Sequence, residues 1–161
     1  MTTTEAIRAR RSIRKYKSGA EITQEQMDLI LEAAMMAPSA RNGRPWDFVV
    51  VRDREKLNAI TEVHPYTKML ATATLAIIIC GAEADFFPQD CGAATQNILL
   101  QAAELGLGTC WCGVYPSKER VESIQRLLGI ANVPFNVIAV GVPDETVAAR
   151  GFYDKQKVRY I

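Results

Sequence analysis

The sequence predicts one domain in which helices alternate with a few buried strands. The chain has 161 residues, of which 48% are apolar, and this is enough for a single core. Short apolar runs at 46–52, 75–80 and 136–143 are typical of buried strands. Capped segments with helical spacing lie between these runs. The sequence shows no repeat, linker or low-complexity tract, so we expect residues 1–161 to form one domain.

Two helices are expected near the N-terminus. Thr2 and Glu5 have the spacing of a capping box, so a helix can begin there and run into a basic segment. Thr23 and Gln26 have the same spacing and begin a second helix, which Pro38 ends. Apolar residues follow that cap at helical intervals: Met27, Ile30, Leu31, Ala34 and Met35.

The middle of the chain predicts a loop, short helices and one unusual long helix. Residues 39–45 have the composition of a loop, and 53–60 and 67–72 predict short helices. Residues 90–105 predict a helix that is apolar nearly all round. Such a helix must be surrounded, and one domain of this size can hardly surround it. We therefore expect part of it to form a subunit interface in an obligate homodimer.

The last third of the chain predicts a strand, a helix and a strand. Residues 106–115 combine a glycine-rich turn with a short strand, in which Trp111 is expected to lie in the core. Residues 117–129 predict a capped helix with Gly129 at its C-terminal end. The buried strand at 136–143 follows, and the tail ends in "DKQKVRYI".

Composition argues against several classes of partner. Nineteen basic and eighteen acidic residues give a net charge of +1, which provides no field for nucleic acid or a membrane surface. No apolar run approaches the roughly 20 residues of a membrane helix, and the first residues lack a signal core. The four cysteines form no CxxC motif, and there is one histidine. We expect a cytoplasmic protein with reduced core thiols and no metal site.

The segment "RARRSIRKY", residues 8–16, concentrates positive charge within this balanced chain. Its basic residues are Arg8, Arg10, Arg11, Arg14 and Lys15. One interpretation is a solvated helix end, where cations also favour the helix dipole. The other is a phosphate site, because two guanidinium groups and the Ser12 hydroxyl suit a phosphate monoester. Lys157 and Arg159, near the other end of the sequence, could converge on the same anion.

An ordered set of motifs covers nearly the whole chain. They are "RRSIRKY", "EAAMMAPSARNGRPWDFVVV", "KML", "AATQNILLQAAELGLGTCWCG" and "GVP". With them the chain resembles the nitroreductase-like flavoprotein family. The resemblance implies an α+β fold with a mixed, mostly antiparallel sheet flanked by helices, in an intertwined homodimer. It also implies two FMN sites at the subunit interface.

The resemblance assigns cofactor contacts to residues at both ends of the chain. It implies that Arg10 contacts the FMN phosphate, that Ser12 and Arg14 lie nearer the ribityl chain and ring edge, and that Arg11 is a neighbour. It implies further phosphate contacts from Lys157 and Arg159. Residues Pro38, Ser39, Ala40 and Asn42 would approach the flavin of the partner subunit. From the residues alone, this last segment is an ordinary turn.

Three further residues are implied at the flavin ring. Lys68 would lie near the pyrimidine end, where a cation stabilises the negative charge that builds up on reduction. Without the resemblance, Lys68 reads as a solvated lysine at a helix start. The backbone of Gly113 would come close to FMN N5, since glycine permits close approach. Cys112 occupies a position where some family members have an acidic residue.

The activity implied is that of an FMN-dependent oxidoreductase. A hydride would pass from NADH or NADPH through FMN N5 to a flat acceptor, such as a nitroaromatic or a quinone, by a ping-pong mechanism. No side chain is named as catalytic, although His64 is a lone candidate acid. We expect Cys110 and Cys112 to point to opposite faces of their strand, which would prevent a redox pair. The alternatives are a flavin-modifying enzyme on the same scaffold and a dimeric flavin-binding module without turnover.

Overall fold

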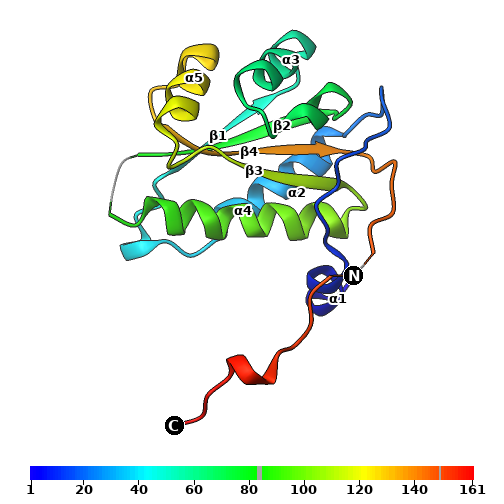
Figure 1. The fold of residues 1–161 in the computed structure, drawn as a ribbon, viewed down its shortest axis with the longest axis vertical. Helices are drawn as coiled ribbons and strands as arrows, with labels where there is room; N and C mark the ends of the chain where they lie inside the picture. The colour runs from blue at the N-terminus through cyan, green and yellow to red at the C-terminus, as the bar shows by residue number, and fades with distance from the viewer. Residues whose placement is uncertain (83–84, 149) are drawn as a thin grey trace.

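The computed structural model describes residues 1–82, 85–148 and 150–161 and has an α+β fold built on one antiparallel sheet (Figure 1). The strand order is β1-β2-β4-β3, and every neighbouring pair is antiparallel. The strands are β1 (Trp46–Val51), β2 (Leu75–Gly81), β3 (Gly108–Gly113) and β4 (Val133–Gly141). β3 is therefore an edge strand, and β2 is buried along its whole length, as its apolar sequence predicted.

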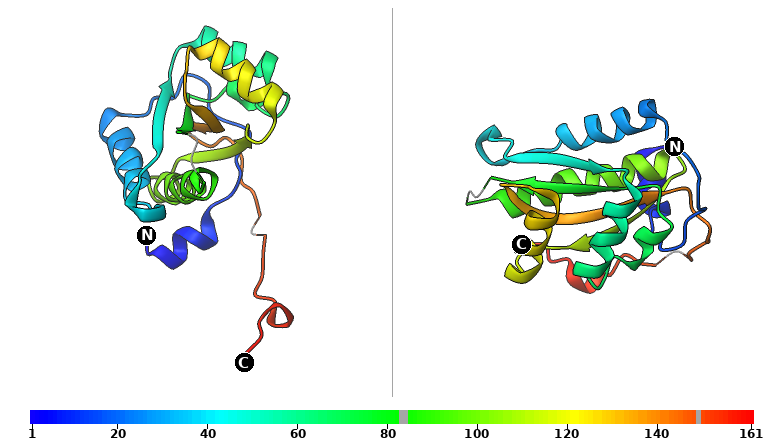
Figure 2. Two further views of the ribbon diagram at one scale, coloured as in Figure 1. Left: turned by 90° about the vertical axis from the view of Figure 1, so that its left-hand side faces the viewer. Right: turned by 90° about the horizontal axis from the view of Figure 1, so that it is seen from above.

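Helices cover both faces of the sheet (Figures 1 and 2). One face carries α2 (Gln24–Met35) and α4 (Phe87–Glu104), and the other carries α3 (Arg54–Val63) and α5 (Lys118–Leu128). Successive residues of a strand face opposite sides, so Ile77 packs toward α2 and α4 while Ile78 packs toward α3 and α5. Because helices cover both faces of β2, the side chains on both faces are buried. This explains why the sequence of β2 is apolar throughout.

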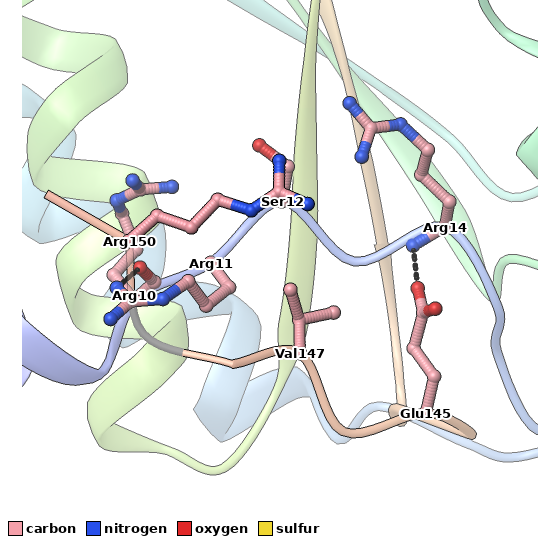
Figure 3. A pocket seen from close by; sticks show the side chains of 7 residues that line it. All are labelled: Arg10, Arg11, Ser12, Arg14, Glu145, Val147 and Arg150. Atoms are coloured by element: carbon pink, nitrogen blue, oxygen red, sulfur yellow. Dashed lines mark hydrogen bonds between the residues drawn. The ribbon is translucent and has the colours of Figure 1, made fainter.

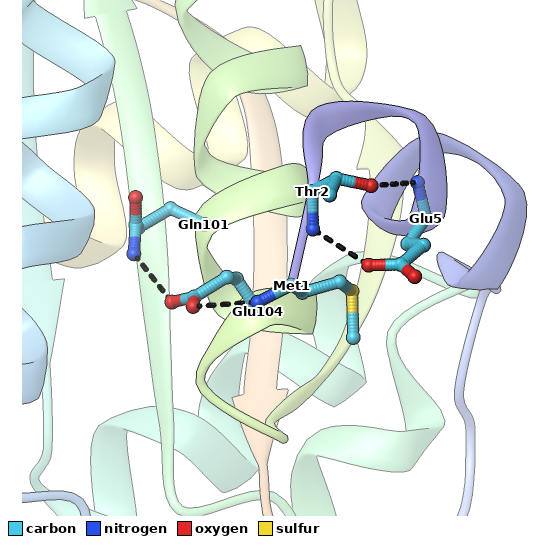
Figure 4. A network of polar contacts seen from close by, with 5 residues as sticks. All are labelled: Met1, Thr2, Glu5, Gln101 and Glu104. Atoms are coloured by element: carbon cyan, nitrogen blue, oxygen red, sulfur yellow. Dashed lines mark hydrogen bonds and ion pairs between the residues drawn. The ribbon is translucent and has the colours of Figure 1, made fainter.

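A short helix near the N-terminus, α1 (Thr3–Ala9), lies against the end of α4. Its capping box is formed as predicted, with Thr2 and Glu5 each bonded to the other's backbone N–H. The ammonium group of Met1 lies 3.5 Å from the Glu104 carboxylate (Figure 4). These contacts place the basic segment that follows α1 beside β3.

Most predicted elements are confirmed, with three corrections. The expected helix at 67–72 is a 3₁₀ turn, η2 (Lys68–Ala71). The Ser117 side chain makes no capping hydrogen bond to α5, although Gly129 ends that helix with the predicted left-handed φ of 66°. Trp111 is 39% exposed rather than in the core, because β3 is at the edge of the sheet.

The chain beyond β4 first returns to the N-terminal segment and then leaves the sheet. Tyr16 pairs with Pro143, and Ser12 forms a parallel bridge with Thr109 of β3. Residues 151–161 extend away from the sheet, and several of their large apolar side chains are exposed (Figures 1 and 2). No helix in the described part of the chain is long and apolar enough to cross a membrane.

Candidate functional site

A basic hollow of about 370 Å³ lies where the N-terminal segment meets the chain that follows β4 (Figure 3). Its lining residues are Arg10, Arg11, Ser12, Arg14, Glu145, Val147 and Arg150. We call it the anion hollow. The Arg10 side chain extends toward Ser12, so a guanidinium and a hydroxyl face the same space. Ion pairs in the described residues join Met1 to Glu104 and Lys118 to Glu122, so no carboxylate neutralises these arginines within 4 Å.

Glu145 is the one acidic residue that lines the anion hollow, and its carboxylate is bonded to the backbone. One oxygen, Oε1, accepts the N–H of Arg14 at 2.5 Å and that of Lys15 at 3.0 Å. The hydrogen bond from Arg14 is the main reason that the pKa of Glu145 lies below its ordinary value. The Glu145 carboxylate therefore binds backbone N–H groups of the N-terminal segment, and the guanidinium groups are available for an anion.

Arg11 has a different task from Arg10. Its Nη1 donates to the Arg10 carbonyl at 2.5 Å, and its Nε donates to the Ala148 carbonyl at 3.2 Å. Asp144 N–H also donates to the Lys15 carbonyl at 2.9 Å. We call residues 143–148 the strap, because these bonds fasten it across the N-terminal segment. Arg11, the predicted neighbour of the phosphate, thus lines the hollow and also fastens the strap.

A second hollow, of about 500 Å³, adjoins the first, and we call it the ring hollow. Arg14 lines both hollows, so the two lie next to each other along its side chain. The other lining residues are Pro65, Tyr66, Lys68, Met69, Cys110, Trp111, Cys112, Gly113 and Arg120. A third space, of about 660 Å³, also contains Arg14, Lys68 and Met69 in its lining. Arg14 is therefore the junction of the basic and the apolar parts of the site.

The free edge of β3 offers backbone groups to the ring hollow. Val114 N–H donates inward to the Phe135 carbonyl at 3.1 Å. The N–H groups of successive strand residues point to opposite sides, so the Gly113 N–H faces the open edge. A Cβ at Gly113 would meet no atom within 4 Å. The fold itself therefore leaves room for a side chain here, and glycine keeps the edge open for a ligand.

Cys110 and Cys112 both line the ring hollow, which corrects our expectation that they face opposite ways. Alternate residues of a strand share a face, and both pack in the core between the sheet, α3 and α5. The Cys112 thiol donates to the Tyr66 carbonyl at 3.2 Å. Its interaction with the Cys110 sulfur, together with burial, raises the pKa of Cys112. Cys112 is therefore a thiol that joins β3 to the wall of the hollow.

His64 is fully buried and does not reach the ring hollow as a proton donor. Its Nε2 lies 2.9 Å from the Gly113 carbonyl, and its Nδ1 accepts the Tyr66 N–H at 3.3 Å. Burial lowers its pKa below the ordinary value of 6.5, so the neutral ring is favoured. The interpretation of His64 as an acid acting on a substrate is therefore wrong.

Six predicted site residues do not line these hollows within one chain. Pro38, Ser39, Ala40 and Asn42 lie in the loop between α2 and β1, and Lys157 and Arg159 are exposed in the tail. The loop has an unusual backbone, with positive φ at Arg41, Asn42 and Arg44. Its Ala40 N–H donates to the buried Asp90 carboxylate of α4 at 2.9 Å. The roles of these six residues remain predictions that need a second subunit.

Several lining residues were not found by sequence reasoning. Tyr66 and Met69 flank Lys68, and an aromatic residue beside that motif was the available signal. Glu145 and Arg150 could not be predicted from the sequence. They line the hollow because the chain after β4 passes over the N-terminal segment, which is more than 130 residues away in the sequence. In the described part of the chain, no group of three or more His, Cys, Asp or Glu residues could hold a metal ion.

Comparison with known proteins agrees with this geometry. A helix-covered antiparallel sheet with a basic hollow beside a second one lined by apolar and basic residues defines an α+β protein with an open, positively charged site. The model of the nitroreductase family matches residues 7–76 and 62–142. The chain belongs to the nitroreductase family.

Individual relatives support this assignment. A Methanothermobacter thermautotrophicus protein, named for an NADH dehydrogenase or NAD(P)H nitroreductase activity, is 48% identical over 98% of this chain and 86% of its own. An FMN-dependent nitroreductase from Clostridium difficile is 34% identical, with a TM-score of 0.90 over 96% of each chain. A Desulfovibrio desulfuricans nitroreductase solved in complex with FMN is 29% identical, with a TM-score of 0.84 over 100% of this chain and 97% of its own.

Proposed function

We propose that this chain is an FMN-dependent oxidoreductase that takes electrons from NADH or NADPH and passes them to a flat acceptor. When bound, FMN would supply the chemistry, taking a hydride at N5 from the nicotinamide and delivering it to a nitroaromatic or quinone-like acceptor in a ping-pong cycle. The observation that carries the proposal is that the basic anion hollow and the ring hollow are neighbours that share Arg14.

The residues present fit a phosphorylated, planar cofactor. Arg10 and Ser12 would bind the phosphate, with Arg150 beside them, because unpaired guanidinium groups favour a dianion. Arg14 and Lys68 line the ring hollow and would supply positive charge near the ring. The outward N–H of Gly113 would donate a hydrogen bond to a ring heteroatom. These assignments make 1–161 one FMN-binding domain, and its cytoplasmic location stays a prediction.

We also propose a homodimer that completes the site. Three apolar residues of α4, Ala93, Leu100 and Ala103, are only partly covered in one chain. The exposed tail residues Phe152 and Tyr160 are 87% and 89% accessible, which is costly for a lone chain. In the homodimer, the loop at 38–42 and the tail with Lys157 and Arg159 would reach the partner's hollows. FMN, NAD(P)H and a small acceptor are the other partners we propose.

An absorbance spectrum of the purified protein tests cofactor binding. We expect flavin bands at about one FMN per chain, or uptake of added FMN to that level. A colourless preparation that takes up no FMN would remove the proposal. Riboflavin, which lacks the phosphate, should bind much more weakly, since it leaves the anion hollow without its ligand.

Anaerobic turnover separates the alternatives. Addition of NADH or NADPH should bleach the bound flavin, and a quinone should restore its colour over many cycles. Retention of FMN through these cycles would exclude a flavin-consuming enzyme, and absence of bleaching would indicate a binding module without turnover. Parallel lines in double-reciprocal plots for the two substrates would support the ping-pong order.

A further inference from the structure

Gly113 is the last residue of the edge strand β3, where it pairs with Asn136 of β4 on one side only. No atom lies within 4 Å of the position that its Cβ would occupy, so packing does not hold it there. Glycine also has the widest choice of backbone conformations. The N–H of Gly113 belongs to the peptide before this residue and its carbonyl to the peptide after it, so contacts that hold the carbonyl also restrict the residue that presents the N–H.

Two side chains from different elements donate to the carbonyl of Gly113. His64, which ends α3, approaches with Nε2 at 2.9 Å, and Arg120 of α5 approaches with Nη1 at 3.2 Å. A carbonyl oxygen has two lone pairs and can accept both bonds together. With Val114 N–H bonded to β4, the peptide on the C-terminal side of Gly113 is held from three directions.

The hydrogen bonds define the protonation state of His64. The Tyr66 N–H can only donate, so Nδ1 must carry a lone pair, and the Gly113 carbonyl can only accept, so Nε2 must carry the proton. A cationic ring would place a second N–H against the Tyr66 N–H, with the Arg120 guanidinium nearby. The arrangement therefore requires the neutral imidazole.

The same residues hold the wall of the ring hollow. The Arg120 Cζ lies 5.0 Å from the centroid of the Tyr66 ring, and the His64 and Tyr66 rings meet edge to face at 6.0 Å. The Cys112 thiol donates to the carbonyl of Tyr66. Tyr66 on one side and Gly113 on the other are thus joined through His64 and Arg120.

We propose that His64 and Arg120 are positioning residues that fix the Gly113 carbonyl and the Tyr66 wall, and thereby set the fit of the ring hollow to a planar ring. The identity of that ring as a flavin rests on the proposed function. Neither residue takes a proton from a substrate, and both act through the backbone that the ring would contact.

The first test uses the protein without flavin. Since His64 is the single histidine of the chain, the imidazole ¹⁵N spectrum of untagged protein reports on this residue alone. We expect a neutral ring protonated on Nε2 at pH 7.5, and a shifted Gly113 amide signal in Arg120→Gln. A proton on Nδ1, or a Gly113 signal that is unchanged in Arg120→Gln, would overturn the proposal.

The second test measures flavin affinity. His64→Leu and Arg120→Gln should each raise the Kd for FMN about fivefold, the effect of losing roughly one hydrogen bond. His64→Gln retains an amide donor and acceptor at similar reach and should restore affinity to within about twofold. Arg126 lies on the exposed side of α5, the helix that carries Arg120. Arg126→Gln is therefore the matched control and should leave the Kd for FMN unchanged.

The outcomes separate this inference from the proposed function. If the wild-type protein binds no FMN but His64 has the expected tautomer, the proposed function fails and the support of Gly113 by His64 stands. If the protein binds FMN and neither His64→Leu nor Arg120→Gln changes the Kd, the positioning role is wrong. Should His64→Leu fail to fold, Arg120→Gln still decides the question, because Arg120 is only partly buried.

Discussion

Single residues divide the work of the site. Arg10 faces the anion hollow, whereas its neighbour Arg11 bonds to two backbone carbonyls and fastens the strap. The resemblance placed Arg10 at the phosphate and Arg11 as its neighbour, but residue type and spacing do not show which guanidinium binds the backbone. The backbone partners of Glu145 could not be predicted either, because its carboxylate accepts N–H groups from a segment far away in the sequence.

Removing the Arg10 side chain tests the anion hollow. Arg10→Ala should weaken FMN binding more than tenfold, or by over ~1.4 kcal/mol, because a charge-assisted contact to the phosphate is lost. Isothermal titration with FMN measures this change. Arg8→Ala is the control, since Arg8 is exposed on α1 and does not line the hollow. An equal loss of affinity in both variants would show that only net charge matters.

Adding one methyl group at Gly113 tests the open edge of β3. Gly113→Ala should leave the free energy of unfolding within about 1 kcal/mol of wild type, because the new Cβ meets no atom within 4 Å. The same Cβ would stand where a ring must approach, so the affinity for FMN should fall about tenfold or more. Chemical denaturation and FMN titration measure the two effects. Full-strength binding by this variant would place the ring elsewhere.

The pKa of His64 gives stability a defined dependence on pH. Burial lowers this pKa below 6.5, so the unfolded chain binds the proton more readily than the folded one. The contribution to stability is therefore complete above about pH 6.5 and decreases as the pH falls through the folded pKa. The unfolding free energy should therefore be lower at pH 5.5 than at pH 7.5, and His64→Gln should reduce this difference.

At the scale of elements, the loop between α2 and β1 shows how a helix can hold a strained backbone. Asp90, in the first turn of α4, accepts the Ala40 N–H at 2.9 Å, and the Ser39 hydroxyl accepts the Arg44 N–H at 3.0 Å. Arg41, the residue after Ala40, has a positive φ of 55°. Non-glycine residues with positive φ cost free energy, so a loop of this kind persists only where neighbouring contacts determine it.

Limited proteolysis tests the contact between α4 and this loop. Asp90→Ala should increase the rate of trypsin cleavage after Arg41 severalfold and lower the unfolding free energy by about 1–2 kcal/mol, since the Ala40 N–H loses its partner. Asp90→Asn keeps an oxygen acceptor and should cleave at nearly the wild-type rate. Equal cleavage rates in wild type, Asp90→Ala and Asp90→Asn would show that the loop conformation does not depend on Asp90.

The elements also show what a sequence can and cannot reveal. Capping boxes and the apolar run of β2 follow local rules, so their positions were predicted to within a few residues. Trp111 was misplaced because sheet order, which makes β3 an edge strand, is a long-range property. Gly113 could be named from its motif, but its support by His64 and Arg120 could not, because three separate elements meet there.

At the scale of the whole molecule, six of the predicted site residues lie outside the hollows of one chain. The loop at 38–42 and the tail lie away from the hollows, and α4 keeps a partly exposed apolar side. We expect sedimentation to give twice the chain mass of 17.8 kDa. Leu100→Glu on α4 should shift the protein toward monomer and weaken FMN binding, whereas Asn58→Glu on the exposed side of α3 should change neither. A wild-type monomer that binds FMN fully would contradict the shared site.

The strap joins residues that are translated far apart in time. Arg10 leaves the ribosome early, but the carboxylate that orders the backbone beside it belongs to Glu145. A nascent chain contains β1 and β2 before it contains the strap that lines the anion hollow. Loading of a cofactor would therefore mark chains whose synthesis has passed the strap, and fragments that end before it would stay empty and exposed to degradation.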